Sequence, residues 1–308
     1  GQRFHDLNRG GWDPVARLAD QDRDGVACEI LYPTIGMVLC GLSDPDYKNA
    51  CMWAYNRWLE SYCSAAPDRL VGLGQTAVRS VKETIEDLRR FKEMGFKGAV
   101  LPGDPATVED YDDPVFDPLW EAAVELDMPL SFHILTGGQR NQHDSLRTMK
   151  VHRGPFIGIY MVYIRALQDI IGMFIFGRVF ERHPKLKIVL VEADAGWAPH
   201  WMSRADHAYR RLNAVTNFGH MERSPSEQFR DNVYLTFGDD VSALQTLQHL
   251  NPRNLLWAND YPHTDALWPD SQEVIGSLMM DMPERERMML LRDNTCALYG
   301  LRQPVTAN

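Results

Sequence analysis

The segment KIVLVEAD, residues 187–194, indicates which kind of sheet this chain builds. Apolar and mostly β-branched residues occupy positions 188–191, and the run then stops on Glu192 and Asp194. A strand that is apolar on both faces is typical of a parallel sheet covered by helices. The segment therefore predicts a buried parallel strand that delivers carboxylates at its carboxyl end.

Six further segments repeat this pattern of a short apolar run followed by a loop and an amphipathic helix. They are residues 26–33, 70–76, 98–103, 129–135, 233–238 and 255–262. The helical spacing is clearest in residues 81–95, where an apolar residue recurs at every third position from Ile85 onward. Strands that alternate with helices over 308 residues predict an α/β fold, a (β/α)8 TIM-like barrel.

The pattern gives seven strands, whereas a closed barrel of this type needs eight. The amino-terminal stretch GQRFHDLNRGGWDP, residues 1–14, is polar and glycine-rich and is therefore a poor strand. We expect the first strand to be missing or to lie upstream of this sequence. We also expect one barrel domain over residues 1–308, with an insertion at about 137–187.

The charge balance limits the partners that the chain is expected to bind. The formal net charge is −10, from 42 acidic and 32 basic residues, and Lys and Arg form no run of five. Nucleic acids and anionic membrane surfaces attract concentrated positive charge, so neither is expected as a partner. The expected partner is a small-molecule substrate. Aromatic residues at helical spacing within 53–62 predict core packing or a subunit interface, and we expect a homo-oligomer, a dimer.

The cysteines and the apolar runs bear on the compartment. Five cysteines without a CxxC pair predict neither a disulfide framework nor a thiolate zinc site. The longest apolar stretch, near residues 156–164, is shorter than the roughly 20 residues that a membrane helix needs. We therefore expect a cytoplasmic protein in a reducing compartment.

Ionisable side chains lie at the ends of three predicted strands. These are His133, Glu192 and Asp260, and His263 follows three residues after the last of them. The carboxyl ends of parallel strands meet at one face of a barrel, and ionisable groups buried there need partners or a cation. An imidazole and carboxylates suit Zn²⁺, Mn²⁺ or Fe²⁺. The alternatives are a core histidine with satisfied hydrogen bonds and a turn-forming Asp.

Four stretches carry a resemblance to a known family. They are SFHILTGG (131–138), FGRVFERHPKLKIVLVEADAGWAPHWMSRADH (176–207), LLWANDYPHTDALWP (255–269) and DNTCALYGL (293–301). In combination they are similar to the amidohydrolase-related family of the amidohydrolase superfamily, which includes aminocarboxymuconate-semialdehyde decarboxylase-like enzymes. The resemblance covers essentially the whole chain. It implies a (β/α)8 barrel with one divalent metal, usually zinc or manganese, at its carboxyl-terminal face.

The resemblance also implies roles for particular residues. His133 matches the family's metal-binding histidine of the fifth strand, and Asp260 matches its metal-binding carboxylate of the eighth. Glu192 stands where many members have a histidine that binds metal or acts as a base. The His-x-His pair of the family's first strand has no counterpart, because the His-Asp pair at residues 5–6 lies in a loop-like stretch. Either upstream residues carry that pair or the metal site is degenerate.

A carboxylate at position 192 favours a metal-dependent hydrolase as the first expectation. His133, Glu192 and Asp260 would hold the ion, zinc before manganese or iron, and Glu192 or Asp260 would take a proton from metal-bound water. His263 would bind substrate or relay a proton, or else support Asp260. The expected substrate is an amide, ester or thioester of a small organic acid. The alternatives are a non-oxidative decarboxylase of an aromatic or unsaturated acid and a metal-free binding or scaffold barrel.

Some of these residues have a structural alternative. Glu192 would then form an ion pair with His183, Arg204 or His207, and Asp194 is expected to cap the helix that begins near Ala198. Three basic residues of the insertion are expected either to contact an acidic substrate or to be solvated: Arg140, His143 and His152.

Overall fold

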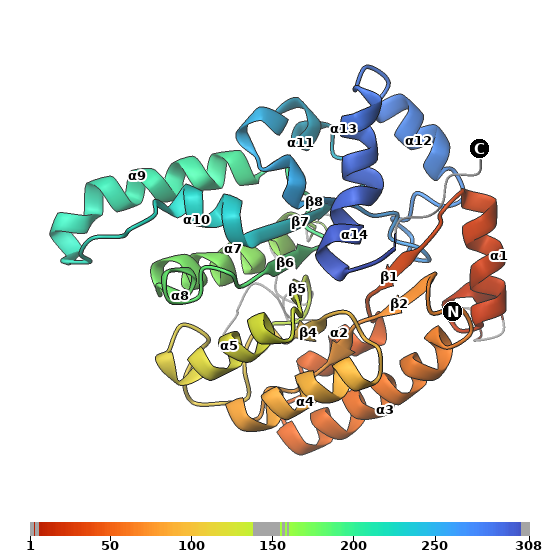
Figure 1. Ribbon diagram of the computed structural model, residues 1–308, viewed down its shortest axis with the longest axis horizontal. Helices are drawn as coiled ribbons and strands as arrows, with labels where there is room; N and C mark the ends of the chain where they lie inside the picture. Colours follow the sequence, from red (N-terminus) through yellow and green to blue (C-terminus); the bar gives the residue numbers. More distant parts are fainter. Residues whose placement is uncertain (1–2, 4–5, 138–154, 156–157, 159, 303–308) are drawn as a thin grey trace.

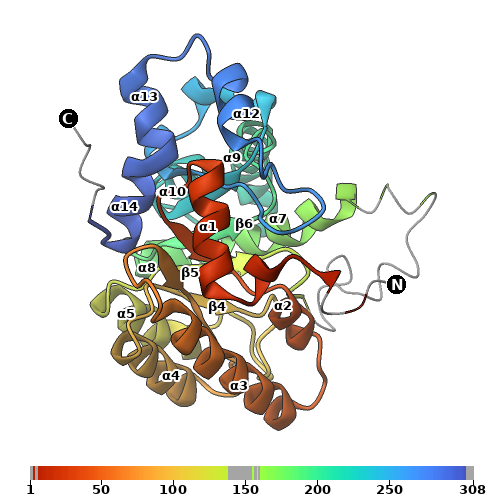
Figure 2. The same cartoon turned by 90° about the vertical axis from the view of Figure 1, so that its right-hand side faces the viewer.

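The structure is a computed structural model that describes residues 3, 6–137, 155, 158 and 160–302 (Figure 1). Short strands lie at the centre of the molecule and helices surround them (Figures 1 and 2). The strands are β1 (Glu29–Leu31), β2 (Leu70–Gly72), β3 (Gly74–Gln75), β4 (Ala99–Leu101), β5 (Leu130–His133), β6 (Ile188–Val191), β7 (Val233–Phe237) and β8 (Leu255–Trp257). Each of the seven predicted segments contains a strand, and the segment 70–76 contains two.

The strands pair in parallel, as expected for a barrel of alternating strands and helices. β1 pairs with β2, and β3 to β8 pair in their sequence order. Leu73 joins the two ladders, where the hydrogen bonding passes from β1 on one side to β4 on the other. Together these features form a TIM-like α/β barrel.

One side of the ladder differs from a closed barrel. Within the described residues, β8 pairs with β7 alone and β1 pairs with β2 alone. The described part of residues 1–28 forms a 3-10 turn (η2, Arg9–Gly11) and helix α1, and no strand. This agrees with the expectation that the polar amino-terminal stretch is not a strand.

Helices cover the outside of the strands (Figures 1 and 2). Their bounds are α1 (Pro14–Asp24), α2 (Ile35–Cys40), α3 (Pro45–Cys63), α4 (Val81–Glu93), α5 (Asp117–Glu125), α7 (Tyr160–Phe176), α8 (Val179–Arg182), α9 (Ala198–Thr216), α10 (Pro225–Asn232), α11 (Val241–Gln245), α12 (Ser271–Leu278), α13 (Glu284–Met288) and α14 (Asn294–Tyr299). Helix α9 projects from the barrel at the left of Figure 1.

Helix α4 shows how local sequence sets an element. The Ser80 side chain accepts a hydrogen bond from the Glu83 amide at its start, which satisfies one of the unpaired amides of the first turn. Leu88 and Phe91, two of the predicted face residues, are fully buried. Gly95 has φ +83°, the left-handed conformation that follows many helix ends. An amphipathic helix with both ends marked therefore lies where its spacing predicts.

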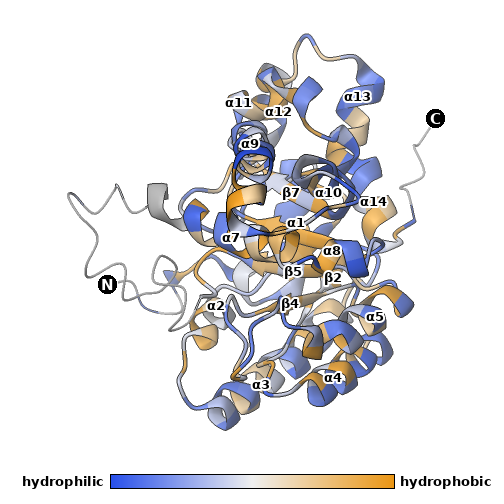
Figure 3. Ribbon diagram, turned by 90° about the vertical axis from the view of Figure 1, so that its left-hand side faces the viewer, coloured by the Kyte–Doolittle hydropathy of each residue, from blue (hydrophilic) through white to orange (hydrophobic). Residues whose placement is uncertain are grey.

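The core between strands and helices is rich in aromatic side chains. The largest fully buried ones belong to one cluster: Phe91, Tyr111, Phe116, Trp120, Phe132, Phe174, Phe180 and Phe237. In Figure 3 the ribbon around β5 is coloured mostly as hydrophobic, whereas helices α3 and α4 carry both colours, as amphipathic helices do. The barrel thus buries a continuous core below the strand ends that carry the candidate site.

Two expectations about the chain as a whole can be compared with the structure. All five cysteines are free and form no disulfide framework. Among the described residues, no helix combines the length and the apolarity needed to cross a membrane.

Candidate metal centre

The ends of three strands bring the predicted site residues to one face of the barrel. His133 is the last residue of β5, and it stands opposite Val191 in the ladder between β5 and β6. Glu192 directly follows β6, and Asp260 lies three residues beyond the end of β8. Because the strands are parallel, these ends point the same way, as the sequence predicted.

The tightest group of candidate ligands is Glu192, Asp260 and His263. Each offers one ligand atom, and these atoms lie within 4.8 Å of one another. The carboxylates and His263 are each 28% exposed, whereas the His133 side chain is only 4% exposed. His133 lies beside this group, with its Nε2 atom 3.1 Å from Glu192 Oε2. The site therefore has a buried side at His133 and an accessible side at Asp260.

The backbone at two of these residues is unusual. Glu192 has φ +61° and Asp260 has φ +54°, both in the left-handed region. That region costs an L-residue about 1–2 kcal/mol, so the surrounding contacts must hold it. At Glu192 one such contact is a hydrogen bond of 2.9 Å that its amide donates to Thr236 Oγ1. Residues that are held in disfavoured backbone conformations are concentrated at functional sites.

The close approach of His133 to Glu192 favours the binding of a cation between the two side chains. His133 Nδ1 lies 2.9 Å from the carbonyl oxygen of Ile134, and a carbonyl only accepts, so Nδ1 carries the hydrogen. In a neutral imidazole Nε2 then presents a lone pair toward Glu192 Oε2. That oxygen is buried and has no hydrogen-bond partner. A positive charge that binds both the Nε2 lone pair and the carboxylate oxygen stabilises this arrangement.

The donor set fits a divalent metal. Two ligand atoms at about 2.1 Å from one ion and at right angles to each other are about 3.0 Å apart. The separation between His133 Nε2 and Glu192 Oε2 is 3.1 Å. Asp260 adds a carboxylate with an oxygen within 4.8 Å of a Glu192 carboxylate oxygen. Imidazole with two carboxylates suits zinc, manganese or iron equally, so the donor set alone does not select one metal.

His263 is held between two partners. Its Nδ1 atom lies 2.9 Å from Asp260 Oδ1, and its Nε2 atom lies 2.9 Å from Thr34 Oγ1. The hydrogen bond to Asp260 raises the pKa of His263, against a smaller opposing effect of burial. Burial raises the pKa of Asp260, and the bond from His263 opposes that rise. The pair can therefore share and pass on a proton.

Thr34 had no predicted role. It follows β1, and 229 positions separate it from His263. The one signal in the sequence was its place after a predicted strand, at the same face as the other site residues.

Two smaller expectations about the site are wrong. Asp194 does not cap α9: its carboxylate accepts a hydrogen bond from the Gly238 amide, and α9 begins without a side-chain cap. His183 does not pair with Glu192, because its Nε2 atom lies 3.0 Å from Asp117 Oδ1 instead. Arg140, His143 and His152 lie outside the described residues.

The sequence places this chain among known proteins. A family model described as Amidohydrolase matches residues 5–301. The chain belongs to the amidohydrolase family. This agrees with the resemblance carried by its four sequence stretches, and it makes the chain an enzyme of that family.

Relatives of this amidohydrolase chain include decarboxylases. It is 24% identical over 311 residues to the 2-amino-3-carboxymuconate-6-semialdehyde decarboxylase of Dictyostelium discoideum, covering 98% of this chain and 80% of that protein. An amidohydrolase from Mycobacterium avium subsp. paratuberculosis has a TM-score of 0.80 at 21% identity, covering 99% of this chain and 77% of the other.

A third similar protein carries a metal. The dihydroxybenzoic acid decarboxylase from Polaromonas sp. JS666 has a TM-score of 0.77 at 20% identity, covering 94% of this chain and 86% of the other. It was solved with bound manganese and the inhibitor 2-nitroresorcinol. At these identities the structural likeness establishes the fold of the amidohydrolase chain, a TIM-like α/β barrel.

Proposed function

We propose that this chain is a metal-dependent, non-oxidative decarboxylase of an aromatic or unsaturated carboxylic acid. The observation that carries this choice is the relative that aligns over 98% of the chain, which is a decarboxylase. The first expectation, a hydrolase, therefore gives way to its alternative. A small-molecule substrate remains the expected partner, while the cytoplasmic location and the dimer stay predictions.

In this proposal His133, Glu192 and Asp260 hold one divalent ion. The support is the buried Glu192 oxygen that lacks a hydrogen bond, the lone pair of His133 facing it, and the nearby Asp260 carboxylate. The manganese in a similar decarboxylase favours manganese over the zinc that the sequence led us to expect. When bound, the ion supplies positive charge for the oxygen atoms of the substrate.

His263 is proposed to handle the proton. In decarboxylation the bond between the carboxylate carbon and the substrate carbon breaks, CO₂ leaves, and the electron pair stays on the substrate carbon. A proton must then bond to that carbon. His263 lies between Asp260 and Thr34 at the accessible side of the site, where its ring can deliver that proton.

The test uses two substrate panels on the same protein. The protein is stripped of metal with a chelator, reloaded with Mn²⁺, and supplied with hydroxybenzoic acids and unsaturated dicarboxylic acids while released CO₂ is measured. Amides, esters and thioesters form the second panel. We expect CO₂ release that needs Mn²⁺ and stops in the chelated protein. Hydrolysis products in the second panel without CO₂ in the first would return the hydrolase to first place.

A further inference from the structure

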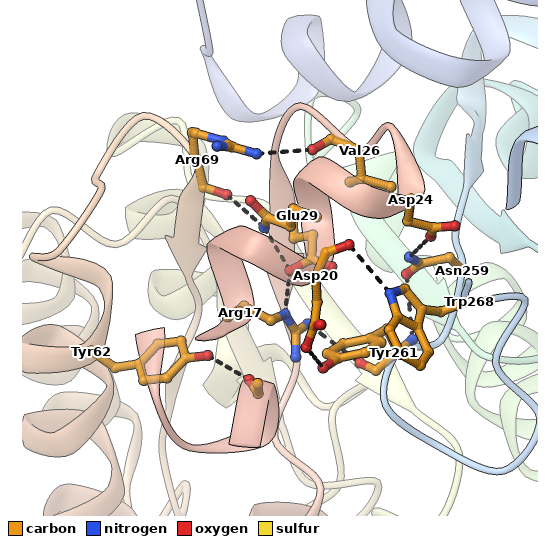
Figure 4. Close-up of polar contacts among 12 residues, drawn as sticks. Arg17, Asp20, Asp24, Val26, Glu29, Tyr62, Arg69, Asn259, Tyr261 and Trp268 are labelled. Carbon is orange, nitrogen blue, oxygen red and sulfur yellow. Dashed lines mark hydrogen bonds and ion pairs between the residues drawn. The ribbon is translucent and has the colours of Figure 1, made fainter. Parts of the chain in front are cut away.

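Helix α1 holds the segment that carries Asp260 from outside the barrel. After β8 the chain runs through residues 258–270 before α12 begins, and this stretch carries both Asp260 and His263. Three α1 side chains form hydrogen bonds to the residues on either side of Asp260: Arg17, Asp20 and Asp24 (Figure 4). We call these three residues the α1 clamp.

Arg17 joins β1 to the residue that follows Asp260. Its Nε atom lies 2.5 Å from Glu29 Oε2 in β1, and its Nη2 atom donates to the Tyr261 carbonyl at 3.3 Å. The guanidinium carbon lies 4.3 Å from the centre of the Tyr261 ring, a cation–π contact. The Arg17 and Glu29 side chains are each only 9% exposed, so the ion pair is little screened by water.

Asp20 and Asp24 complete the contacts. Asp24 is 1% exposed, and its Oδ2 atom accepts hydrogen bonds from Asn259 Nδ2 at 3.2 Å and from Ser271 Oγ at 2.6 Å. The Tyr261 hydroxyl donates to the Asp20 carboxylate (Figure 4). The residues on both sides of Asp260 are therefore fixed by α1.

Fixing both neighbours matters because Asp260 itself is in a disfavoured conformation. Its φ of +54° is one that an L-residue leaves unless its surroundings hold it. In that conformation its carboxylate meets His263 and lies within reach of Glu192. Without the clamp, the backbone is free to relax and turn the carboxylate away from this group.

We propose that the α1 clamp positions Asp260 for metal binding, with Arg17 as its principal positioning residue. This inference rests on the proposed metal site and adds the device that preforms it. Arg17 touches neither the ion nor the substrate in this proposal. It acts through the backbone of Tyr261, as outer contacts of metal ligands commonly do.

The test removes the clamp without leaving a buried charge. Arg17→Gln alone strands Glu29 and is expected to destabilise the fold, so the double variant Arg17→Gln/Glu29→Gln is used. The control is Arg182→Gln/Asp117→Asn, because Arg182 and Asp117 form an ion pair of 2.9 Å whose further partners, Gly177, Asp112 and His183, are not residues of the site.

Two properties are measured in each folded protein. Isothermal titration of Mn²⁺ gives the dissociation constant, which should rise about 10- to 100-fold in the clamp variant and stay near the wild-type value in the control. Hydrogen exchange of the metal-free protein, read by mass spectrometry, should become faster in residues 258–270. The amides of His263 and Leu267 report directly, because both are hydrogen-bonded within this stretch.

The outcomes separate this inference from the proposed function. A folded clamp variant that binds Mn²⁺ as tightly as wild type overturns the inference, and so does unchanged exchange in residues 258–270. Wild-type protein that binds no Mn²⁺ overturns the proposed metal site, and the exchange measurement then decides whether the clamp holds the segment.

Discussion

At the scale of single residues, the most informative atom is Glu192 Oε2. It is buried, accepts no hydrogen bond, and faces an imidazole nitrogen that presents a lone pair. An arrangement of this kind is unfavourable without a positive charge, because a buried carboxylate oxygen that lacks a partner loses its hydration. A bound metal ion supplies that positive charge, and the structural alternative is an ion pair with a protonated His133 at 3.1 Å.

Replacing Glu192 by Gln should lower the affinity for metal without lowering the stability of the fold. Gln keeps the size of the side chain, and its amide can donate to His133 Nε2, so the metal-free variant should melt at the wild-type temperature or above it. Affinity for Mn²⁺ should fall at least about tenfold. Calorimetric melting and Mn²⁺ titration check both, with Glu181→Gln as the control, because Glu181 pairs with Arg178 instead of a site residue. Unchanged affinity would return Glu192 to a structural role.

Replacing His263 by Asn tests the proton role. We expect kcat to fall by about 100-fold or more, the usual effect of losing a positioned acid or base. Mn²⁺ affinity should change much less, because both ring nitrogens already bind Asp260 and Thr34. Steady-state kinetics on the best substrate of the panel, with Thr34→Val as a milder companion variant, measure the effect. A normal kcat would show that His263 only supports Asp260.

The meeting of the four candidate site residues at one face was predictable, because each ends or follows an apolar strand segment, which is a local pattern. The bond from Thr34 to His263 was not, because it joins positions 229 residues apart and leaves no mark on sequence spacing. The left-handed backbone conformation at Glu192 and Asp260 could not be predicted from the sequence either, since neither residue is a glycine.

At the scale of elements, α10 offers a clean test of local stabilisation. Ser224 and Glu227 form a capping box at its start: the Ser224 side chain accepts from the Glu227 amide, and the Glu227 side chain accepts from the Ser224 amide. Ser224→Ala should lower the free energy of unfolding by about 1 kcal/mol. Urea unfolding measures this, with the exposed mid-helix change Ser203→Ala in α9 as the control. Equal stability of the two variants would contradict the capping role.

Asp87 in helix α4 should make the stability of the folded protein depend on pH. Burial raises the pKa of this carboxyl group, although the Thr76 hydroxyl donates to it at 2.7 Å. Between its ordinary pKa of about 3.9 and the raised value, the folded state holds more protons than the unfolded state. The contribution of Asp87 to stability is therefore fully present below about pH 4 and is lost as pH rises through the folded pKa.

Asp87→Asn removes this titration. The free energy of unfolding of the variant minus that of wild type should therefore grow as pH rises from about 4 to about 7. Urea unfolding at several pH values gives this difference, and its slope is the readout, because the loss of one acceptor shifts the whole curve without changing its slope. A flat difference would show that Asp87 has an ordinary pKa in the folded protein.

Helix α1 was the element that sequence reading missed. Signals for it were present: Asp13 caps its start, Pro14 occupies its first position, and Gly25 ends it with φ +69°. Its role was harder to see, because Arg17, Asp20 and Asp24 look like a charged solvated face in the sequence. Two of them, Arg17 and Asp24, are buried against β1 and the segment after β8.

At the scale of the whole molecule, the alternation of strands and helices was enough to predict the parallel ladder and its order. It did not predict the break at Leu73, because both halves of residues 70–76 are equally apolar and only the change of partner divides them. Nor did this alternation predict which reaction the protein catalyses. One barrel fold can carry either hydrolysis or decarboxylation, so that choice came from relatives and not from the fold.

The central claim is that the strand ends of this barrel hold a divalent metal between His133, Glu192 and Asp260. The most direct measurement is an anomalous difference map from crystals of the protein soaked in Mn²⁺, recorded at a wavelength where manganese scatters anomalously. We predict one strong peak in contact with Glu192 and Asp260 on the side of His133. A map without a peak among these residues at saturating Mn²⁺, or with its main peak elsewhere, would contradict the account.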